Sequence, residues 1–372
     1  HIQPIISGKL SVSQRDVNGT SVEVYHLEKH SKIAQEHLDS MADTLKYGNE
    51  HFGQYTAKQL RLFEMPNVLR VSGYAMPQMM LLDERLGFVV DREKIGAFDH
   101  LYRRTAHETA HQWWGHGLDS AITEGGSMMV ETLAVYTQAK LLDQKYGPEY
   151  MNRLLQYAND RYFFGRGQSR EVEKPLYRAS EKHLIYSKGT VAMHALQQKL
   201  GANKVNDALK HMLQAHRYPA KPATSLDFIY ALNLVTEHKY QDFIDYWLKT
   251  TAVNDWQLES AEVTTLPNGD FNVAVCASNQ MDNSTIANDV ALTLTVGIFT
   301  ENPASFYDKP LDERTLLQGQ LTISSKAVGK SEMECGTYQV AEKPRYIVID
   351  PYYQTLDQRR DNNLLLINKD DK

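Results

Sequence analysis

The pattern His107-Glu108-Thr109-Ala110-His111 constrains this chain more than any other stretch of it. Histidines four residues apart lie on one face of a helix, because an α-helix has about 3.6 residues per turn. That spacing lets both imidazoles bind one Zn²⁺ ion, and the glutamate between them can act as general base on the attacking water. Helices that bind no metal also carry this pattern by chance, so the surrounding residues decide between the two interpretations.

The residues around the pattern predict a helix that begins near Phe98. Apolar or small side chains recur there at helical spacing, at positions 98, 101, 102, 105, 106, 109, 110 and 113. His107 and His111 lie at the edge of this stripe, which favours a position facing a cleft over one in the deepest core.

A catalytic zinc ion needs three protein ligands and one open position. A third histidine placed as in the metzincins is excluded, because positions 114 and 117 would have to be glycine and histidine, and they are Trp114 and Gly117. Two glutamates about twenty residues past the motif remain as candidates, Glu124 and Glu131. Glu124 precedes two glycines and is expected in a connecting loop.

Glu131 lies inside a second predicted helix, which runs from about Ser127 to Tyr146 and ends before Gly147-Pro148. A helix can aim its carboxylate at a metal ion. The alternative is a solvated carboxylate on a helix surface, but the neighbouring residues are nearly all apolar. Since a buried carboxylate without a cationic partner is costly, Glu131 is the favoured third ligand.

The composition limits the kind of protein this can be. With 372 residues the chain exceeds one typical core, so two or three domains are expected. A net charge of −6 gives no reason to expect a nucleic-acid partner. The apolar runs fall short of the roughly 20 residues that a membrane span needs. Because the chain opens at His1 without a methionine, it is expected to be a fragment of a longer protein.

Hydrophobic periodicity predicts an α+β protein. Residues 1–26 are expected to form strands around Asn18-Gly19 that remain from a missing N-terminal β-domain. A helix is predicted from about His26 to Phe52, and strands at 60–71 and 86–90. Further helices follow between about 149 and 250, one of them opened by the capping-box-like sequence Thr224-Ser225-Leu226-Asp227.

From about Trp256 the pattern changes to alternation, most clearly from Val290 to Ile298, and predicts a small β-sandwich over residues 256–351. Residues 352–372 are expected to be a polar tail, in which the apolar run Leu364-Leu365-Leu366-Ile367 docks on the body and the last five residues fray. The two cysteines, Cys276 and Cys335, could form a disulfide or remain two buried thiols, and the sequence leaves both alternatives open.

The motif region resembles a known family. The stretch from Ala106 to Gly115 is similar to the zinc helix of the gluzincin metallopeptidases of the membrane alanyl aminopeptidase (aminopeptidase N) family. The stretch Glu131-Thr132-Leu133-Ala134-Val135-Tyr136 resembles that family's third-ligand segment, with one residue more between His111 and Glu131 than is usual. The resemblance supports Glu131 over Glu124. It implies a thermolysin-like zinc peptidase domain, here residues 27–255, followed by the β-sandwich.

Two further segments extend the resemblance. Ile185-Tyr186-Ser187-Lys188-Gly189 resembles the family's Tyr-Glu-Lys-Gly segment, which implies that the Tyr186 hydroxyl stabilises the oxyanion. Asp83-Glu84-Arg85-Leu86-Gly87-Phe88 occupies the place of the family's Gly-x-Met-Glu-Asn strand, which implies that Glu84 binds the substrate's free α-amino group. Only the glutamate and the later glycine of that strand are retained, so strict aminopeptidase specificity stays open.

The segments Phe52-Gly53-Gln54-Tyr55 and Tyr346-Ile347-Val348-Ile349-Asp350-Pro351-Tyr352 resemble the peptidase-like domain that follows ABC-transporter permease segments in bacterial membrane proteins. This implies a parent protein anchored in the bacterial inner membrane, with the present domain extracytoplasmic. The expected function is a zinc-dependent peptidase with one Zn²⁺ per chain that acts on free N-termini of peptides. The alternative is a non-catalytic, zinc-containing peptide-binding module of a membrane transporter. The intact Glu108 and Tyr186 argue against that alternative.

Overall fold

The computed structural model describes residues 5–66, 73–89, 99–217, 219–280, 290–303, 315–324 and 333–367. The chain divides into two compact units. The first consists of His1–Lys145 and Asn206–Ala231, and the second of Tyr146–Val205 and Leu232–Lys372.

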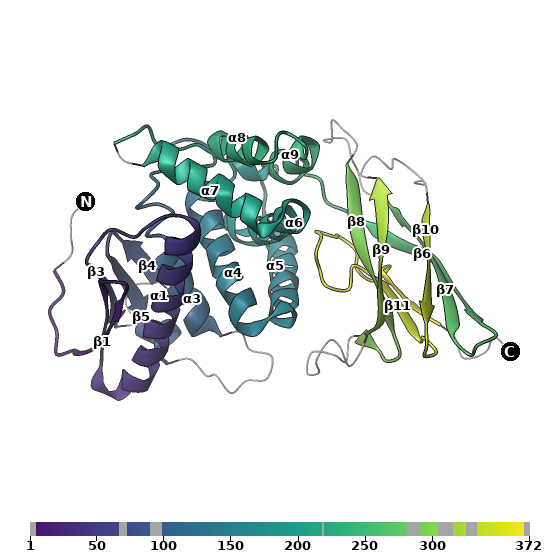
Figure 1. Ribbon diagram of the computed structural model, residues 1–372, viewed down its shortest axis with the longest axis horizontal. Helices are drawn as coiled ribbons and strands as arrows, with labels where there is room; N and C mark the ends of the chain where they lie inside the picture. Colours follow the sequence, from purple (N-terminus) through teal and green to yellow (C-terminus); the bar gives the residue numbers. More distant parts are fainter. Residues whose placement is uncertain are drawn as a thin grey trace. The chain divides into compact units, whose positions relative to one another are not determined.

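The first unit is built on a mixed five-stranded sheet in the order β1-β2-β3-β5-β4 (Figure 1). Its strands are β1 (Ser11–Val17), β2 (Thr20–His26), β3 (Gln59–Met65), β4 (Gly73–Met76) and β5 (Met79–Asp83). Strands β2, β3 and β5 are parallel, while β1 and β4 are antiparallel to their neighbours and form the two edges. The strands that the sequence analysis assigned to a remnant of another domain are therefore hydrogen-bonded into this sheet.

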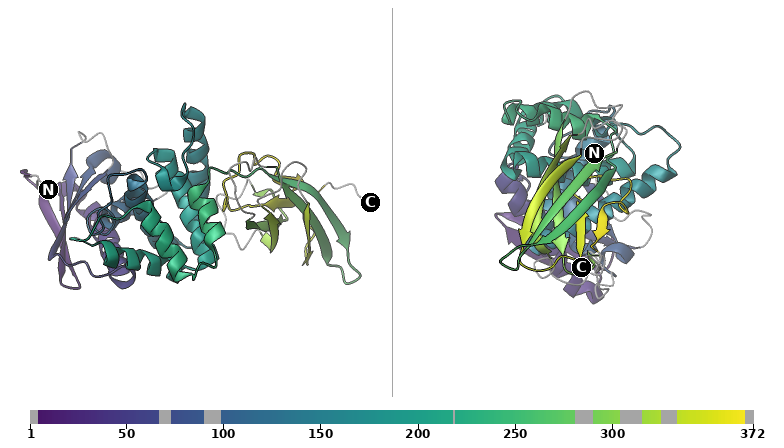
Figure 2. Two further views of the ribbon diagram at one scale, coloured as in Figure 1. Left: turned by 90° about the horizontal axis from the view of Figure 1, so that it is seen from above. Right: turned by 90° about the vertical axis from the view of Figure 1, so that its right-hand side faces the viewer.

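Helices α1 (Ser31–His51) and α3 (His100–Ala110) pack together, α1 against β1 and β2, and α3 against β4 (Figures 1 and 2). Polar contacts hold α3 against α1: Nδ1 of His37 lies 2.6 Å from the Thr105 hydroxyl, and the Ser40 hydroxyl donates to the carbonyl of Tyr102. The Asp99 carboxylate caps α3 by accepting from the Tyr102 N–H. The predicted motif helix is thus present as α3, and its contacts with α1 fix its position.

The prediction of a strand at 86–90 is wrong for residues 86–89, which the structure describes. A short helix, α2 (Glu84–Gly87), lies there instead, because the Asp83 carboxylate accepts from the Arg85 N–H and starts a helical turn. The strand comes earlier, at Met79–Asp83, and all five of its residues are buried. The predicted strand at 60–71 ends at Met65, and positions 67–71 lie outside the described residues.

The remaining helical segments follow the predicted order along the chain. They are η1 (Glu28–His30), η2 (Met128–Thr132), α4 (Leu133–Tyr146), α5 (Pro148–Gln168), η3 (Leu176–Arg178), η4 (His183–Lys188), α6 (Gly189–Leu200), α7 (Ala202–His216), α8 (Ser225–Val235) and α9 (Gln241–Lys249). Two of these, η2 and η4, are π-helical. At the start of α8, the N–H and hydroxyl of Thr224 donate to the Asp227 carboxylate, which confirms the predicted capping box.

The C-terminal part of the second unit contains two antiparallel sheets. One is ordered β10-β7-β6 and the other β12-β11-β8-β9. Their strands are β6 (Trp256–Thr265), β7 (Phe271–Asn279), β8 (Ala291–Phe299), β9 (Thr315–Ser324), β10 (Glu334–Val340), β11 (Tyr346–Ile349) and β12 (Leu364–Leu366). Burial alternates along β8 from Ala291 to Leu294, as the alternation predicted, but every residue from Leu294 to Phe299 is buried. A mixed sheet with helices followed by antiparallel sheets confirms the α+β class.

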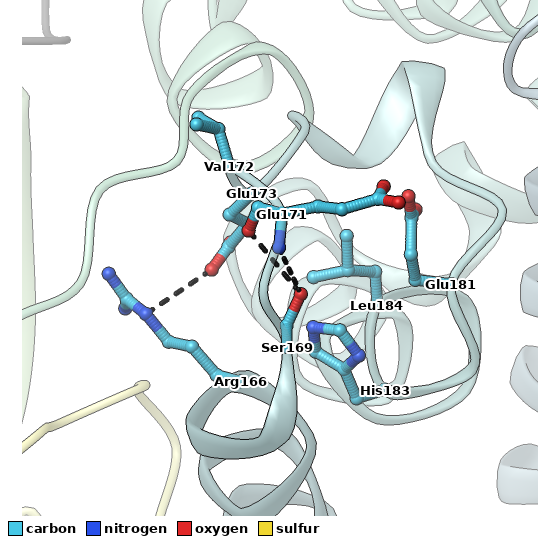
Figure 3. A pocket seen from close by; sticks show the side chains of 8 residues that line it. All are labelled: Arg166, Ser169, Glu171, Val172, Glu173, Glu181, His183 and Leu184. Carbon is cyan, nitrogen blue, oxygen red and sulfur yellow. Dashed lines mark hydrogen bonds and ion pairs between the residues drawn. The ribbon is translucent and has the colours of Figure 1, made fainter.

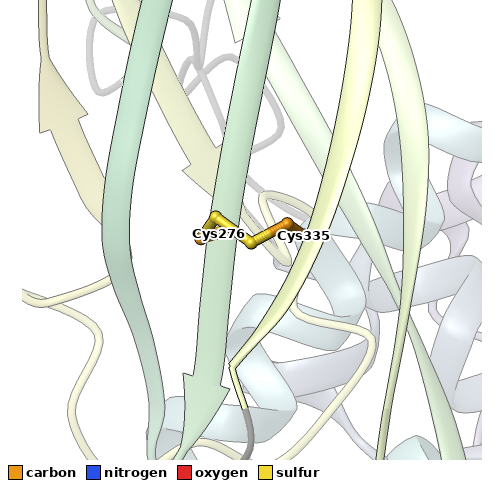
Figure 4. The surroundings of a disulfide bond; sticks show 2 residues. All are labelled: Cys276 and Cys335. Carbon is orange, nitrogen blue, oxygen red and sulfur yellow. A yellow bond between two sulfur atoms is a disulfide. The ribbon is translucent and has the colours of Figure 1, made fainter.

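The structure decides between the two alternatives for the cysteines. Cys276 on β7 and Cys335 on β10 stand opposite one another in the strand register and are joined by a disulfide (Figure 4). The expected tail is largely integrated, because β12 pairs with β11 and Arg359 makes a 2.8 Å ion pair with Asp255. The last five residues lie outside the described part of the chain.

No helix among the described residues combines the length and the apolar character that a membrane crossing requires.

Candidate metal centre

Helix α3 with its C-terminal cap and the helical segment η2 bring three ligand atoms together. Nε2 of His107 lies 3.2 Å from an Oε atom of Glu131, and Nε2 of His111 lies 3.7 Å from the same oxygen. The ligand atoms of the three residues all lie within 4.8 Å of one another. Two imidazole nitrogens and one carboxylate oxygen form the donor set of a catalytic zinc site, so these residues fit a zinc ion chemically.

Local hydrogen bonding orients His111 toward that position. Its Nδ1 lies 3.0 Å from the carbonyl oxygen of Trp114, which accepts a hydrogen bond from the ring N–H and leaves the Nε2 lone pair available to a metal. Burial, together with the nearby His107, lowers the pKa of the His111 imidazole to about 4. The ring is therefore neutral at physiological pH, which is the state that binds metal.

Glu131 lies in η2, the π-helical turn that precedes α4. Helices with i→i+5 turns are rare and occur mostly as single turns, frequently at functional sites. Such a turn takes one residue more than an α-helical turn, so the helix itself can absorb the additional residue between His111 and Glu131. The alternative ligand, Glu124, is exposed in the turn that leads into this helix.

The carboxylate of Glu108 lies beside the three ligands in a confined space. Glu108 is only 8% exposed. Burial, partly opposed by the nearby His107 and reinforced by Glu131, raises the pKa of Glu108 to about 7. A carboxyl group with a pKa near 7 can both take up and release a proton at neutral pH, as a general base and acid must.

Sequence reasoning missed the strand that borders this carboxylate. A Cβ atom added to Gly73 of β4 would lie 2.5 Å from an Oε atom of Glu108, so only a glycine leaves room for the glutamate there. The Gln112 side chain fixes this strand to the end of the motif helix, because it donates to the Met76 carbonyl and accepts from the Gln78 N–H. No local sequence pattern marks contacts between residues more than thirty positions apart.

The two other predicted site residues do not belong to this group of three ligands. Tyr186 is half-buried on η4 and belongs to the second unit. Glu84 begins α2, where its carboxylate pairs with Lys29 at 3.0 Å and belongs to a second group of potential metal ligands together with His30 and Glu64. The predicted roles of Tyr186 and Glu84 stay predictions.

The second unit contains a cavity of about 180 Å³ near η4 (Figure 3). It is lined by Arg166, Ser169, Glu171, Val172, Glu173, Glu181, His183 and Leu184. Glu173 makes ion pairs with Arg166 at 3.4 Å and with the buried Lys188 at 2.9 Å. These two ion pairs hold the segment before η4 against α5 and against η4.

The first unit thus combines a mixed sheet with two helical segments that bring two histidines and a glutamate together as potential metal ligands. The sequence model described as "Peptidase family M1 domain" matches residues 36–247, which is more than half of the chain. The chain therefore belongs to peptidase family M1.

Comparison with individual proteins gives a similarity of fold. None of the curated proteins matches the chain. Among solved structures, the crystal structure of Legionella pneumophila aminopeptidase A in complex with aspartic acid is similar, with a TM-score of 0.58 at 10% sequence identity. The match covers 94% of this chain and 38% of that chain, so the present chain spans well under half the length of that protein. At this identity the likeness shows the fold alone.

Proposed function

We propose that the chain is a metal-dependent peptidase in which His107, His111 and Glu131 hold one Zn²⁺ ion and Glu108 transfers protons. The observation that carries the proposal is the convergence of three metal-ligand atoms beside the buried carboxylate of Glu108. Membership of peptidase family M1 supports a peptide as the substrate.

Each residue has a defined task in this proposal. When bound, zinc would polarise the scissile carbonyl and lower the pKa of a water molecule toward about 7. Glu108 accepts a proton from the attacking water and delivers it to the nitrogen of the leaving amine. The confined position of its carboxylate beside Gly73 keeps it aimed at the ligand group.

Tyr186 is assigned the stabilisation of the oxyanion, on the resemblance of its segment to the family's Tyr-Glu-Lys-Gly sequence. A hydrogen-bond donor in that role lowers the reaction barrier by roughly 3–4 kcal/mol. A Tyr186→Phe variant is therefore expected to retain zinc and substrate binding and to lose kcat.

The preference for free N-termini depends on Glu84. The structural neighbour is titled an aminopeptidase, which supports an exopeptidase. A carboxylate that binds a substrate ammonium group would have to exchange its present partner, Lys29, for the substrate. Comparing free with N-terminally blocked peptides tests this part separately: equal cleavage of both would remove the assigned role of Glu84.

The proposal is tested by measuring zinc content and turnover of aminoacyl-p-nitroanilides and blocked peptides by the same preparation. The expected result is one zinc ion at this centre with turnover of free substrates. Glu108→Gln should keep the zinc and lose turnover by about 10²–10⁴-fold. Full zinc occupancy without cleavage of either substrate class would contradict the proposal and favour a peptide-binding module.

An extracytoplasmic location is part of the same proposal. The disulfide between Cys276 and Cys335 supports it, because disulfides persist mainly in oxidising compartments. Attachment to a transporter permease in a bacterial membrane rests on the sequence resemblance alone and remains a prediction.

A further inference from the structure

Three potential metal ligands gather where the parallel strands of the first unit's sheet end. Strands β2, β3 and β5 are adjacent and parallel, so their carboxyl ends lie at the same end of the sheet. His30 lies in η1, just after β2, Glu64 is the penultimate residue of β3, and Glu84 directly follows β5. In sheets of parallel strands, ligands bind beyond the carboxyl ends, because the loops that follow the strands meet there.

The side chains of these three residues point toward one another. Their ligand atoms lie within 4.8 Å of each other, and Nδ1 of His30 is hydrogen-bonded at 2.7 Å to an Oε atom of Glu64, a bond that a metal ion would replace. His30 and Glu64 are buried, at 9% and 4% exposure, while Glu84 is half-buried at the opening. The second carboxylate oxygen of Glu64 accepts the Leu27 N–H at 2.8 Å, which holds the carboxylate in this orientation.

A cation already lies at the outer side of the group. The Lys29 ammonium is 3.0 Å from Glu84, yet the lysine side chain is 62% exposed. A mostly exposed lysine can turn into solvent at little cost, because exposed ion pairs contribute only about 0–1 kcal/mol. A divalent ion would replace one positive charge by two, beside two carboxylates of which one is buried.

We propose that His30, Glu64 and Glu84 form a second divalent-cation site, which binds Zn²⁺ or Mn²⁺ in exchange for the Lys29 ammonium. In this site Glu84 is a metal ligand in place of the substrate contact that its resemblance to the family's strand implies. The donor set decides the class of ion: an imidazole favours a transition metal over Mg²⁺ and Ca²⁺, while two carboxylates also suit Mn²⁺. The ion joins the ends of three parallel strands and therefore stabilises the sheet that supports the motif helix.

This site uses none of the residues of the first metal centre, so it is tested where that centre is disabled. The His107→Gln/Glu131→Gln variant of the full chain is stripped of metal and titrated with Zn²⁺ and Mn²⁺ by calorimetry. Co²⁺ absorption serves as a second readout, because imidazole and carboxylate ligation changes its visible spectrum. We expect one ion per chain and a rise in the melting temperature on binding.

Three substitutions in that background separate the ligands from their surroundings. Glu84→Gln should weaken binding by at least about tenfold, since it removes a ligand at the accessible side of the group. Lys29→Met should tighten binding, because it removes the competing ammonium and leaves all three ligands intact. Glu28→Gln is the matched control in the same segment, and it should leave the affinity unchanged.

Several results would overturn the proposal. Absence of binding in both the background variant and its Lys29→Met derivative would do so, since no ligand is altered in either. Binding that Glu84→Gln leaves unchanged would also do so. If Glu84→Gln in the otherwise unaltered chain raises KM for free peptides but leaves the metal content unchanged, Glu84 binds substrate and not a metal ion.

Discussion

A single methyl group added at Gly73 should disable the reaction without removing the metal. In Gly73→Ala, the new Cβ atom would lie 2.5 Å from the nearer Glu108 oxygen and 2.8 Å from its carboxyl carbon. Ordinary contact begins at 3.4 Å, so the carboxylate has to move by about 0.9 Å. Glu108 is almost fully buried, which leaves it little room for that movement.

The expected loss follows from the size of this displacement. A misplacement of about 1 Å in a catalytic constellation can cost about 100-fold in rate, which corresponds to about 2.7 kcal/mol of activation free energy. Glu108 is not among the proposed metal ligands, so zinc content should stay at the wild-type value. The Cβ atom would also come within 2.8 Å of Leu82, which adds a destabilisation of about 1–3 kcal/mol that is measured separately.

The assay compares kcat and zinc content of Gly73→Ala with those of the wild type and of Gly167→Ala. The control substitution adds the same methyl group where no atom lies within 4 Å. It should leave both quantities unchanged. A Gly73→Ala protein that is folded, contains full zinc and retains kcat within about twofold would refute the assignment of Glu108 as the proton-transferring group.

Three further outcomes follow from the described contacts. Glu131→Gln should weaken zinc binding at the first centre by more than about 100-fold in a metal titration, whereas Glu124→Gln, at the alternative position, should leave it intact. Replacing Cys276 and Cys335 by serine opens a loop of 59 residues and should lower the free energy of unfolding by about 4 kcal/mol in urea denaturation, with no change if the two thiols are not bridged. Burial raises the pKa of Asp357 from 3.8 to about 7. Between these two pH values the folded protein keeps a proton that the unfolded chain releases. The free energy of unfolding therefore falls as the pH rises from about 4 to 7, by on the order of 4 kcal/mol. Asp357→Asn should remove this loss when unfolding is compared at pH 5 and pH 8, and an identical pH dependence of both proteins would show that the carboxyl group is ionised throughout.

Sequence reasoning located what depends on local spacing. The prediction of the His107 and His111 pair rests on helical periodicity, and that of Glu131 over Glu124 on the contrast between a helix and a glycine-containing turn and on the family resemblance. The structure groups these three residues as potential metal ligands. The capping pair Thr224 and Asp227 was accessible for the same reason, since its partners are three residues apart.

Contacts between distant segments could not be predicted in this way. Gly73 is 35 positions from Glu108, and its importance depends on the antiparallel edge strand that places it there. The fully buried β5 resembles a helix segment as closely as a strand, because neither shows alternation. The disulfide depended on the register of β7 with β10, which two cysteines alone do not determine.

The most direct test of the central claim is anomalous diffraction at the zinc absorption edge from crystals of this chain. We predict an anomalous peak between Nε2 of His107, Nε2 of His111 and the Glu131 carboxylate, at about 2.0–2.2 Å from each, with one coordination position left for water or substrate. A zinc-saturated crystal with no peak between these three side chains, or with a fourth protein ligand closing the site, would contradict it.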